Sequence, residues 1–144
     1  MTSTCLANLE KIGSLDPVPV SAELIGRIAK HAHQQLKDSG LEQASNETRF
    51  DCAYNAIRAV ADIGLLRKGY RPSTKKPGHH QISIQSPGHT LNVDPDVIRL
   101  LDALRRQRSG SNYDGDTVTE AALSECRRQA KAMVALLDAA LAAG

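Results

Sequence analysis

Residues 94–114 read DPDVIRLLDALRRQRSGSNYD, and this stretch decides the fold class that the sequence predicts. Asp94 followed by Pro95 is a helix start signal, so we expect a helix from there to about Arg108. Its apolar residues recur three to four positions apart, as on one face of an α-helix. They are Val97, Ile98, Leu101 and Leu104. After this helix, Ser109-Gly110-Ser111 indicates a polar turn.

Two arginines continue the apolar face of this helix. Arg108 lies four residues after Leu104, and Arg105 falls on the same side. An unpaired buried charge is costly, so each guanidinium must meet a carboxylate, a carbonyl or a bound anion. For Arg108 two interpretations stay open: an ion pair with Asp114 or Asp116 that fixes the end of the helix, or a site for an anionic ligand.

The composition predicts one helical domain that spans residues 1–144. Alanine, leucine and isoleucine dominate the apolar residues, which favours helix over sheet. Aromatic residues make up only 3% of the chain, so we do not expect an aromatic platform for stacking bases. The net charge of +2 is too small to indicate nucleic-acid binding by itself. Most basic residues are expected on solvated faces, although arginines crowd the C-terminal third, among them Arg105, Arg106, Arg108, Arg127 and Arg128.

The sequence also favours a cytoplasmic location. Cys5, Cys52 and Cys126 lie far apart without a C-x-x-C spacing, as expected of small buried thiols in a reducing compartment. We find no secretory signal pattern at the N-terminus and no apolar stretch of membrane-spanning length.

Start and stop signals divide the chain into about five helices. Ser21 and Asn46 are the expected N-caps of two of them, and Thr117-Val118-Thr119-Glu120 is a capping-box pattern for the last. The expected helices span roughly 3–14, 21–39, 46–69, 94–108 and 117–142. Residues 70–93 form one long irregular loop, in which Gln81–Gln85 favours a helical turn over an unpaired strand. This order predicts an all-α, up-and-down helical bundle.

The helix from residue 46 has the clearest apolar stripe. Arg58 and Asp62 are spaced four residues apart and are expected to pair on its outer surface. In the first helix, Leu6, Leu9 and Ile12 are expected to point inward. The stripe itself consists of Phe50, Ala53, Tyr54, Ile57, Ala61 and Leu65.

Several separated segments resemble the HEPN superfamily (higher eukaryotes and prokaryotes nucleotide-binding). Leu104 to Asp114, followed by Val118-Thr119-Glu120-Ala121-Ala122, is similar to the family's Leu-x-x-x-Arg-x-x-Tyr-Asp pattern and its capped last helix. Residues 47–56 resemble the start of the central helix, and the segments 69–72 and 78–80 resemble a loop and helix start in related bacterial chains. The resemblance covers roughly residues 20–142 and implies a HEPN-type bundle.

The resemblance also implies a function in toxin–antitoxin or defence systems. Many members are ribonucleases whose motif is an arginine, a polar residue and a histidine, assembled across a dimer seam, and others are non-catalytic partners of minimal nucleotidyltransferases. Here the motif arginine is Arg108, Ser109 stands in place of the usual asparagine, and Tyr113 stands near the histidine position. A tyrosine with a pKa near 10 is a poor general base, so we expect a non-catalytic or weakly catalytic module.

We therefore expect a homodimer that acts with RNA, a nucleotide or a nucleotidyltransferase partner, with no cofactor and no metal. The candidate ligand-binding residues are Arg105, Arg108, Asn112, Tyr113, Asp114, His79 and His80. Two other hypotheses stay open. In one, the chain is a metal-independent ribonuclease whose base comes from His79, His80 or His89 in the long loop. In the other, it is a purely structural interaction module.

Overall fold

The computed structural model describes the backbone of residues 2–114 and 117–144, and the side chains of residues 4–110 and 117–144. Most of these residues are helical, which confirms the predicted all-α bundle. The helices are α1 (Thr2–Lys11), α2 (Ala22–Asp38), α3 (Asn46–Arg67), α4 (His79–Gln85), α5 (Pro87–Thr90), α6 (Pro95–Asp114) and α7 (Glu120–Ala142). Two three-residue strands, β1 (Leu15–Pro17) and β2 (Tyr70–Pro72), complete the fold.

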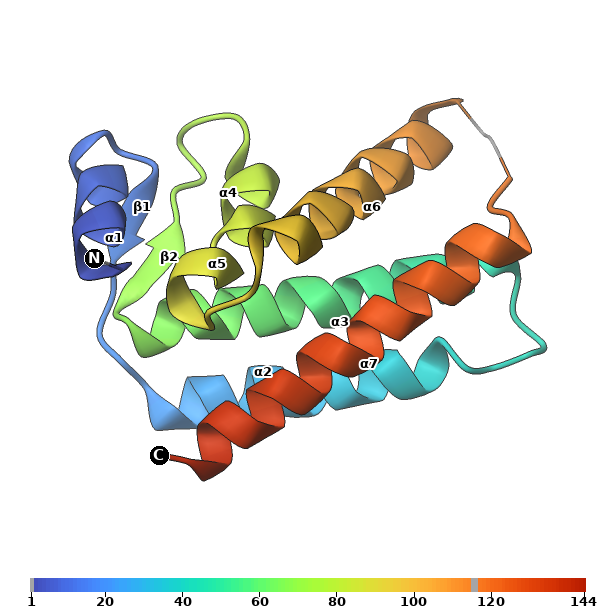
Figure 1. The fold of residues 1–144 in the computed structure, drawn as a ribbon, viewed down its shortest axis with the longest axis horizontal. Coiled ribbons are helices and arrows are strands. Elements are labelled where there is room, and N and C mark those ends of the chain that lie inside the picture. Colours follow the sequence, from blue (N-terminus) through green and yellow to red (C-terminus); the bar gives the residue numbers. More distant parts are fainter. Residues whose placement is uncertain (1, 115–116) are drawn as a thin grey trace.

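Helix α3 is the central element of the bundle. It packs against α2, α4, α6 and α7. Figure 1 shows that the four long helices α2, α3, α6 and α7 alternate in chain direction. The predicted stripe of α3, from Phe50 to Leu65, is buried, and α3 is also buried on its other sides at Ala56, Val60 and Ile63. Because neighbours cover α3 on most sides, the polar side chains along its middle are at most partly exposed.

Side-chain caps fix where three of the helices begin. The Ser21 hydroxyl accepts a hydrogen bond from the Leu24 amide at 3.2 Å, which confirms the cap predicted for α2. For α3 the prediction was wrong by one residue, because Ser45 caps the helix and Asn46 is its first residue. Thr119 caps α7 by accepting from the Ala122 amide at 3.1 Å. The predicted capping box, with Thr117 as the cap and Glu120 at the third helical position, is therefore wrong by two residues.

Helix α6 continues beyond the end that the sequence predicts. It runs to Asp114, so Ser109-Gly110-Ser111 is helical and the predicted polar turn is wrong. Gly110 keeps a negative φ, and a Cβ added to it would meet nothing within 4 Å. Serine and glycine weaken a helix by at most about 1 kcal/mol each, and the apolar face that precedes them is anchored in the core.

The segment predicted as one irregular loop contains defined structure. Residues 81–85 lie in α4, as the favoured helical turn predicted, and α5 follows. Strand β2 at the start of this segment pairs antiparallel with β1, with Asp16 opposite Arg71, and the sequence did not predict this ribbon. Ile12 is 59% exposed, so its predicted inward position is wrong.

A small second hydrophobic core lies between the ribbon, α1 and α3. Leu6 of α1, Leu15 of β1 and Leu65 of α3 pack together and are almost fully buried. The ribbon therefore holds α1 against the C-terminal half of α3.

Cys126 of α7 is fully buried, and burial raises the pKa of its thiol to about 12. Cys5 and Cys52 are only partly buried, so the prediction of buried thiols holds fully for Cys126 alone.

Within the part of the chain that the structure describes, the helices are too short or too polar to span a membrane.

Candidate functional site

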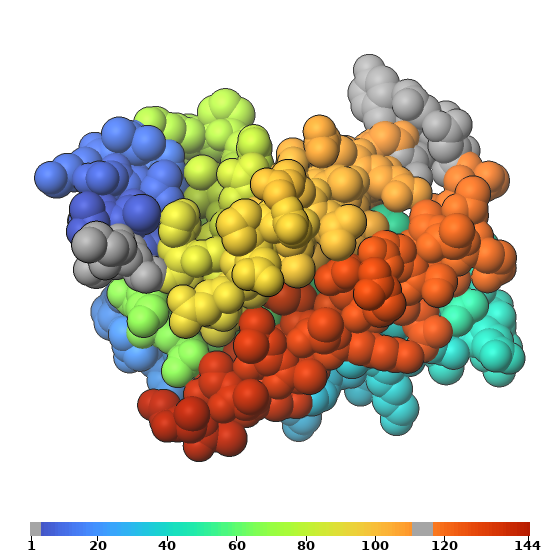
Figure 2. Space-filling view, in the orientation of Figure 1, coloured from blue at the N-terminus to red at the C-terminus, as the bar shows by residue number. Residues whose placement is uncertain are grey.

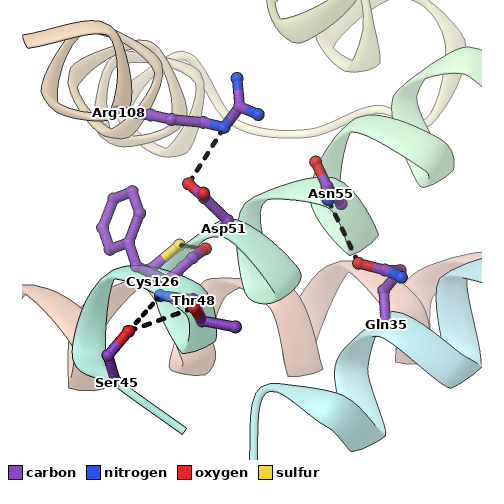
Figure 3. Close-up of polar contacts among 8 residues, drawn as sticks. Gln35, Ser45, Thr48, Asp51, Asn55, Arg108 and Cys126 are labelled. Carbon is purple, nitrogen blue, oxygen red and sulfur yellow. Dashed lines mark hydrogen bonds and ion pairs between the residues drawn. The ribbon is translucent and has the colours of Figure 1, made fainter. Parts of the chain in front are cut away.

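Both arginines on the apolar face of α6 turn toward the interior, as the sequence predicts. The Arg108 side chain is 27% exposed, and its Nε lies 3.3 Å from Oδ1 of Asp51 in α3 (Figure 3). Arg105 is 20% exposed and donates from Nε to Oδ1 of Asp102 on its own helix, at 2.9 Å. Each buried guanidinium has thus found a carboxylate. The partner seen for Arg108 is Asp51, whereas the side chains of the candidates Asp114 and Asp116 lie outside the described residues.

A stripe of polar side chains on α3 lies under α4 and α6. Asp51, Tyr54, Arg58 and Asp62 are spaced three to four residues apart, which places them on one side of the helix. Arg58 Nε lies 4.0 Å from Asp62 Oδ2, and the two side chains are only 33% and 31% exposed. The prediction that this pair lies on the outer surface is therefore wrong, because α4 packs over this part of α3.

Tyr54 is the buried aromatic residue of the cluster. Its ring is buried, and the guanidinium carbon of Arg108 lies 5.1 Å from the ring centroid, within cation–π range. Burial raises the pKa of the Tyr54 hydroxyl, although the nearby positive charges of Arg58, Arg108 and Arg105 oppose this shift. The hydroxyl therefore stays protonated at neutral pH and is available as a hydrogen-bond donor.

Three buried donor atoms in this cluster have no hydrogen-bond partner among the described residues. They are Tyr54 Oη, Arg58 Nε and Arg108 Nε. Arg108 Nε is within ion-pair distance of Asp51, but the N–H does not point at the carboxylate well enough to form a hydrogen bond. Buried polar groups are nearly always hydrogen-bonded, so a water molecule or a ligand oxygen would supply the acceptor for these donors. We call Tyr54, Arg58 and Arg108 the donor cluster.

Helix α4 adds two histidines to the edge of the donor cluster. The rings of His79 and His80 lie edge to face, with centroids 4.4 Å apart. The pKa of His80 is lowered to about 4, first by burial and then by surrounding positive charges. These charges belong to Arg58, His79, Arg108 and Arg105. His80 is therefore neutral at neutral pH and can accept a proton or donate a hydrogen bond.

The carboxylate of Asp62 connects α3 to α4. The Ser83 hydroxyl donates a hydrogen bond to Asp62 Oδ1 at 2.5 Å. Burial raises the pKa of Asp62, while the Ser83 hydrogen bond and the charges of Arg58 and His79 act in the opposite direction. This link fixes α4, and with it the histidines, over the polar stripe of α3.

The structure brings together four of the seven candidates from the sequence, namely Arg105, Arg108, His79 and His80. The side chains of the other three, Asn112, Tyr113 and Asp114, lie outside the described residues, and their backbone forms the last turn of α6. His89 is not part of the cluster, because it lies on α5 in a separate hollow lined by Ile98 and Arg99.

Sequence reasoning missed the α3 residues Asp51, Tyr54, Arg58 and Asp62 as site residues. The signal that could have found them is a polar stripe at helical spacing in a helix that is otherwise apolar. Among the described side chains, no group of three or more His, Cys, Asp or Glu is placed to hold a metal ion. The donors of the cluster, two guanidinium groups and a hydroxyl, can each donate to an acceptor oxygen.

Nothing matches this chain in comparisons with protein-family models, with curated proteins and with solved structures.

Proposed function

We propose that this chain is a HEPN-like helical module that binds RNA or a nucleotide through a phosphate group at the donor cluster. The module is non-catalytic or weakly catalytic and acts in a toxin–antitoxin or defence setting. The observation that supports this proposal is the set of orphaned buried donors on Tyr54, Arg58 and Arg108. A phosphate oxygen accepts several hydrogen bonds at once, and arginine donors bind phosphate more strongly than neutral donors do.

The two arginines of the donor cluster lie near carboxylates, but their Nε atoms form no hydrogen bonds to them. The Arg58–Asp62 contact is long at 4.0 Å, and the Arg108–Asp51 contact lacks hydrogen-bond geometry. Neither pair satisfies its guanidinium, so a phosphate can gain hydrogen bonds without breaking strong ones. Asp51 is 40% exposed and can turn toward water when an anion enters.

The test is binding of a short fluorescein-labelled oligouridylate, measured by fluorescence anisotropy, with uridine monophosphate as competitor. Arg108→Gln and Tyr54→Phe are expected to weaken binding about tenfold or more, the effect of losing one charge-assisted hydrogen bond. Arg106→Gln is the matched control, since this arginine is on the same helix, pairs with Asp102, and is 67% exposed. Equal affinity of Arg108→Gln, Tyr54→Phe and the wild type would overturn the proposal and leave the structural interpretation of Arg108.

A ribonuclease is the second candidate, favoured by the position of His80. This imidazole is neutral at neutral pH and lies beside the arginines, as a base for the 2′-hydroxyl would have to. A pKa of about 4 makes it a weak base in the free protein. A bound phosphate would raise that pKa, because a nearby negative charge favours the imidazolium.

The cleavage assay compares the wild type with His80→Ala and His79→Ala, using a labelled RNA and no added metal. Cleavage that disappears in His80→Ala, while RNA affinity is kept, assigns the base to His80. If His80→Ala cleaves as the wild type does, the base is not His80. If the wild type does not cleave RNA, the binding module is the better description.

The proposal extends to partners. In a HEPN-type homodimer, the face that bears Arg105, Arg108 and Tyr113 would lie near the seam, and a minimal nucleotidyltransferase would be a partner. Co-expression with an adjacent nucleotidyltransferase gene, where one exists, tests the second point. Growth arrest on expression, relieved by Arg108→Ala in a variant that still folds, supports the toxin setting.

A further inference from the structure

A second basic site lies on the other side of α3 from the donor cluster. A surface hollow of about 340 Å³ opens between α7 and the first turn of α3. Figure 2 shows the orange and red surface of α7 beside the cyan surface of the segment that follows α2. Four basic side chains line the hollow: Arg49, Arg127, Arg128 and Lys131. Arg49 and Asp51 are two residues apart in α3 and point in nearly opposite directions, so this hollow is separate from the donor cluster.

The positive charges around this hollow outnumber the negative charges. Arg128 pairs with Glu125 at 2.6 Å. Among the described residues, Arg49, Arg127 and Lys131 make no ion pair. The acid that lines the hollow, Glu120, accepts a hydrogen bond from Asn46 at 3.3 Å. The local charge is therefore clearly positive, which lowers the free energy of a bound anion.

Two of the guanidinium groups are held in place by the same serine. Arg49 donates from Nε to the carbonyl oxygen of Ser39 at 2.9 Å, and Arg127 donates from Nε to the Ser39 hydroxyl at 3.4 Å. Ser39 is fully buried and so is a rigid anchor. Because the Nε–H of each arginine is used in this way, its Nη groups remain for a ligand.

Gly40 makes room for this arrangement. A Cβ at Gly40 would lie 3.2 Å from Nη2 of Arg127, which is too close for an ordinary contact. The absence of a side chain next to Ser39 thus lets the Arg127 guanidinium lie against the end of α2. Two arginines are thus oriented by one buried serine, with a lysine beside them. This arrangement is more ordered than a row of charged side chains that point into solvent.

We propose that this hollow, lined by Arg49, Arg127 and Lys131, is a second phosphate-binding site. No aromatic side chain lines it, so it offers no stacking surface for a base and recognises the phosphate group itself. The phosphate belongs either to the backbone of a single-stranded RNA or to a small phosphorylated molecule. The site does not depend on the function proposed for the donor cluster.

The experiment has two arms. In the first, inorganic phosphate is titrated into labelled protein while the Nε–Hε signals of Arg49 and Arg127 are followed by NMR. In the second, a fluorescein-labelled oligouridylate is bound at several salt concentrations. The test variant is Arg127→Gln/Lys131→Gln. The matched control, Arg27→Gln/Lys30→Gln, removes two positive charges from exposed positions of α2.

In the test variant, RNA affinity is expected to fall about tenfold or more. The dependence of log K on log salt concentration should also become shallower. The magnitude of its negative slope should decrease by about 1.4, which is about 0.7 for each phosphate of a single strand that is no longer neutralised. The control should keep the wild-type slope. A phosphate-induced shift of Arg49 that is present in the wild type and vanishes in the test variant also supports the site, and unchanged RNA affinity then assigns it to a small phosphorylated molecule.

The proposal is overturned if phosphate shifts neither arginine and the test variant binds RNA like the control. Circular dichroism and thermal unfolding check that the variant folds, and Lys131→Gln alone is the fallback because Lys131 is exposed. Tyr54→Phe distinguishes the two sites. It should weaken binding at the donor cluster and leave the phosphate shifts of Arg49 and Arg127 intact.

Discussion

Arg108 of α6 lies over the ring of Tyr54 of α3, with 5.1 Å between the guanidinium carbon and the ring centroid. The contact joins the two helices at the point where α6 would otherwise leave the core, since Leu104 is the last buried apolar residue of α6 among those with described side chains. An arginine on an aromatic ring keeps its edge free for hydrogen bonds. Arg108 therefore both packs α6 on α3 and belongs to the donor cluster, where its Nε is buried.

Tyr54→Phe separates stability from binding. The hydroxyl is buried without a hydrogen-bond partner among the described residues, so its removal relieves a desolvation cost and leaves the ring packing intact. We expect the free energy of unfolding in urea to rise by about 1 kcal/mol, while affinity for the oligouridylate falls. A stability loss in Tyr54→Phe would mean that the hydroxyl already has a strong partner in the free protein, and would argue against the donor cluster.

Arg108→Gln should destabilise the fold only modestly. The side chains of the Arg108–Asp51 pair are 27% and 40% exposed, so water screens the pair. We expect a loss of about 1 kcal/mol, rather than the roughly 3–5 kcal/mol of a fully buried pair. A double-mutant cycle with Asp51→Asn, measured by urea unfolding, gives the coupling energy directly. A coupling of several kcal/mol would favour the structural interpretation, in which Arg108 mainly holds α6 in place.

His80 should make the fold less stable in mild acid. In the unfolded chain it binds a proton below a pH of about 6.5, whereas in the folded chain its pKa is about 4. Between these values the unfolded state holds more protons, so the free energy of unfolding falls as the pH falls. The His80→Gln variant should show a flatter dependence over this range in urea unfolding at a series of pH values.

His31→Gln is the control for this experiment, because that histidine is exposed on α2. Asp62, whose pKa is raised by burial, contributes a pH dependence of opposite sign, and the comparison between variants cancels it. An unchanged slope in His80→Gln would mean that burial and the neighbouring positive charges do not lower the pKa of His80 in the folded chain.

Gly64 should not tolerate a side chain. A Cβ there would lie 2.4 Å from Oγ1 and 3.1 Å from Cβ of Thr90 in α5. We expect Gly64→Ala to lower the free energy of unfolding by about 1–3 kcal/mol, since overpacking outweighs the gain in helix propensity. Adding Thr90→Ala should recover most of the loss.

Gly26 provides the opposite case on α2. A Cβ at Gly26 would meet nothing within 4 Å, so Gly26→Ala should stabilise the fold by about 0.5–1 kcal/mol. Thermal unfolding of the three variants checks both expectations. If Gly64→Ala and Gly26→Ala behaved alike, close packing of α5 on α3 would be ruled out.

The sequence predicted what depends on local signals. Ser21 lies at the start of a helix with the right spacing of apolar residues behind it, and α2 begins there. The last helix was also predicted, although its observed cap, Thr119, lies two residues after the start of the predicted capping box. The buried stripe from Phe50 to Leu65 could also be predicted, because helical periodicity is visible in the sequence without knowing which helix packs against it. The inward direction of Arg105 and Arg108 followed from the same periodicity.

What the sequence could not predict depends on contacts between distant segments. Asp51 meets Arg108 only because α6 crosses α3 at that point, and no local pattern encodes the crossing. His80 reaches the arginines because α4 packs on both α3 and α6. Strands β1 and β2 are three residues each, too short for an alternating pattern to stand out.

The pairing of β1 with β2 has a consequence for how the molecule opens. Leu65 is shielded from water by Leu6 and Leu15, and the segment that bears both leucines is attached through a three-residue ribbon. A brief separation of β1 from β2 would expose an apolar patch of α3 to water while the contacts among α2, α3 and α7 stay intact. Amide exchange of α1 and β1 should therefore begin before global unfolding, which hydrogen–deuterium exchange can measure.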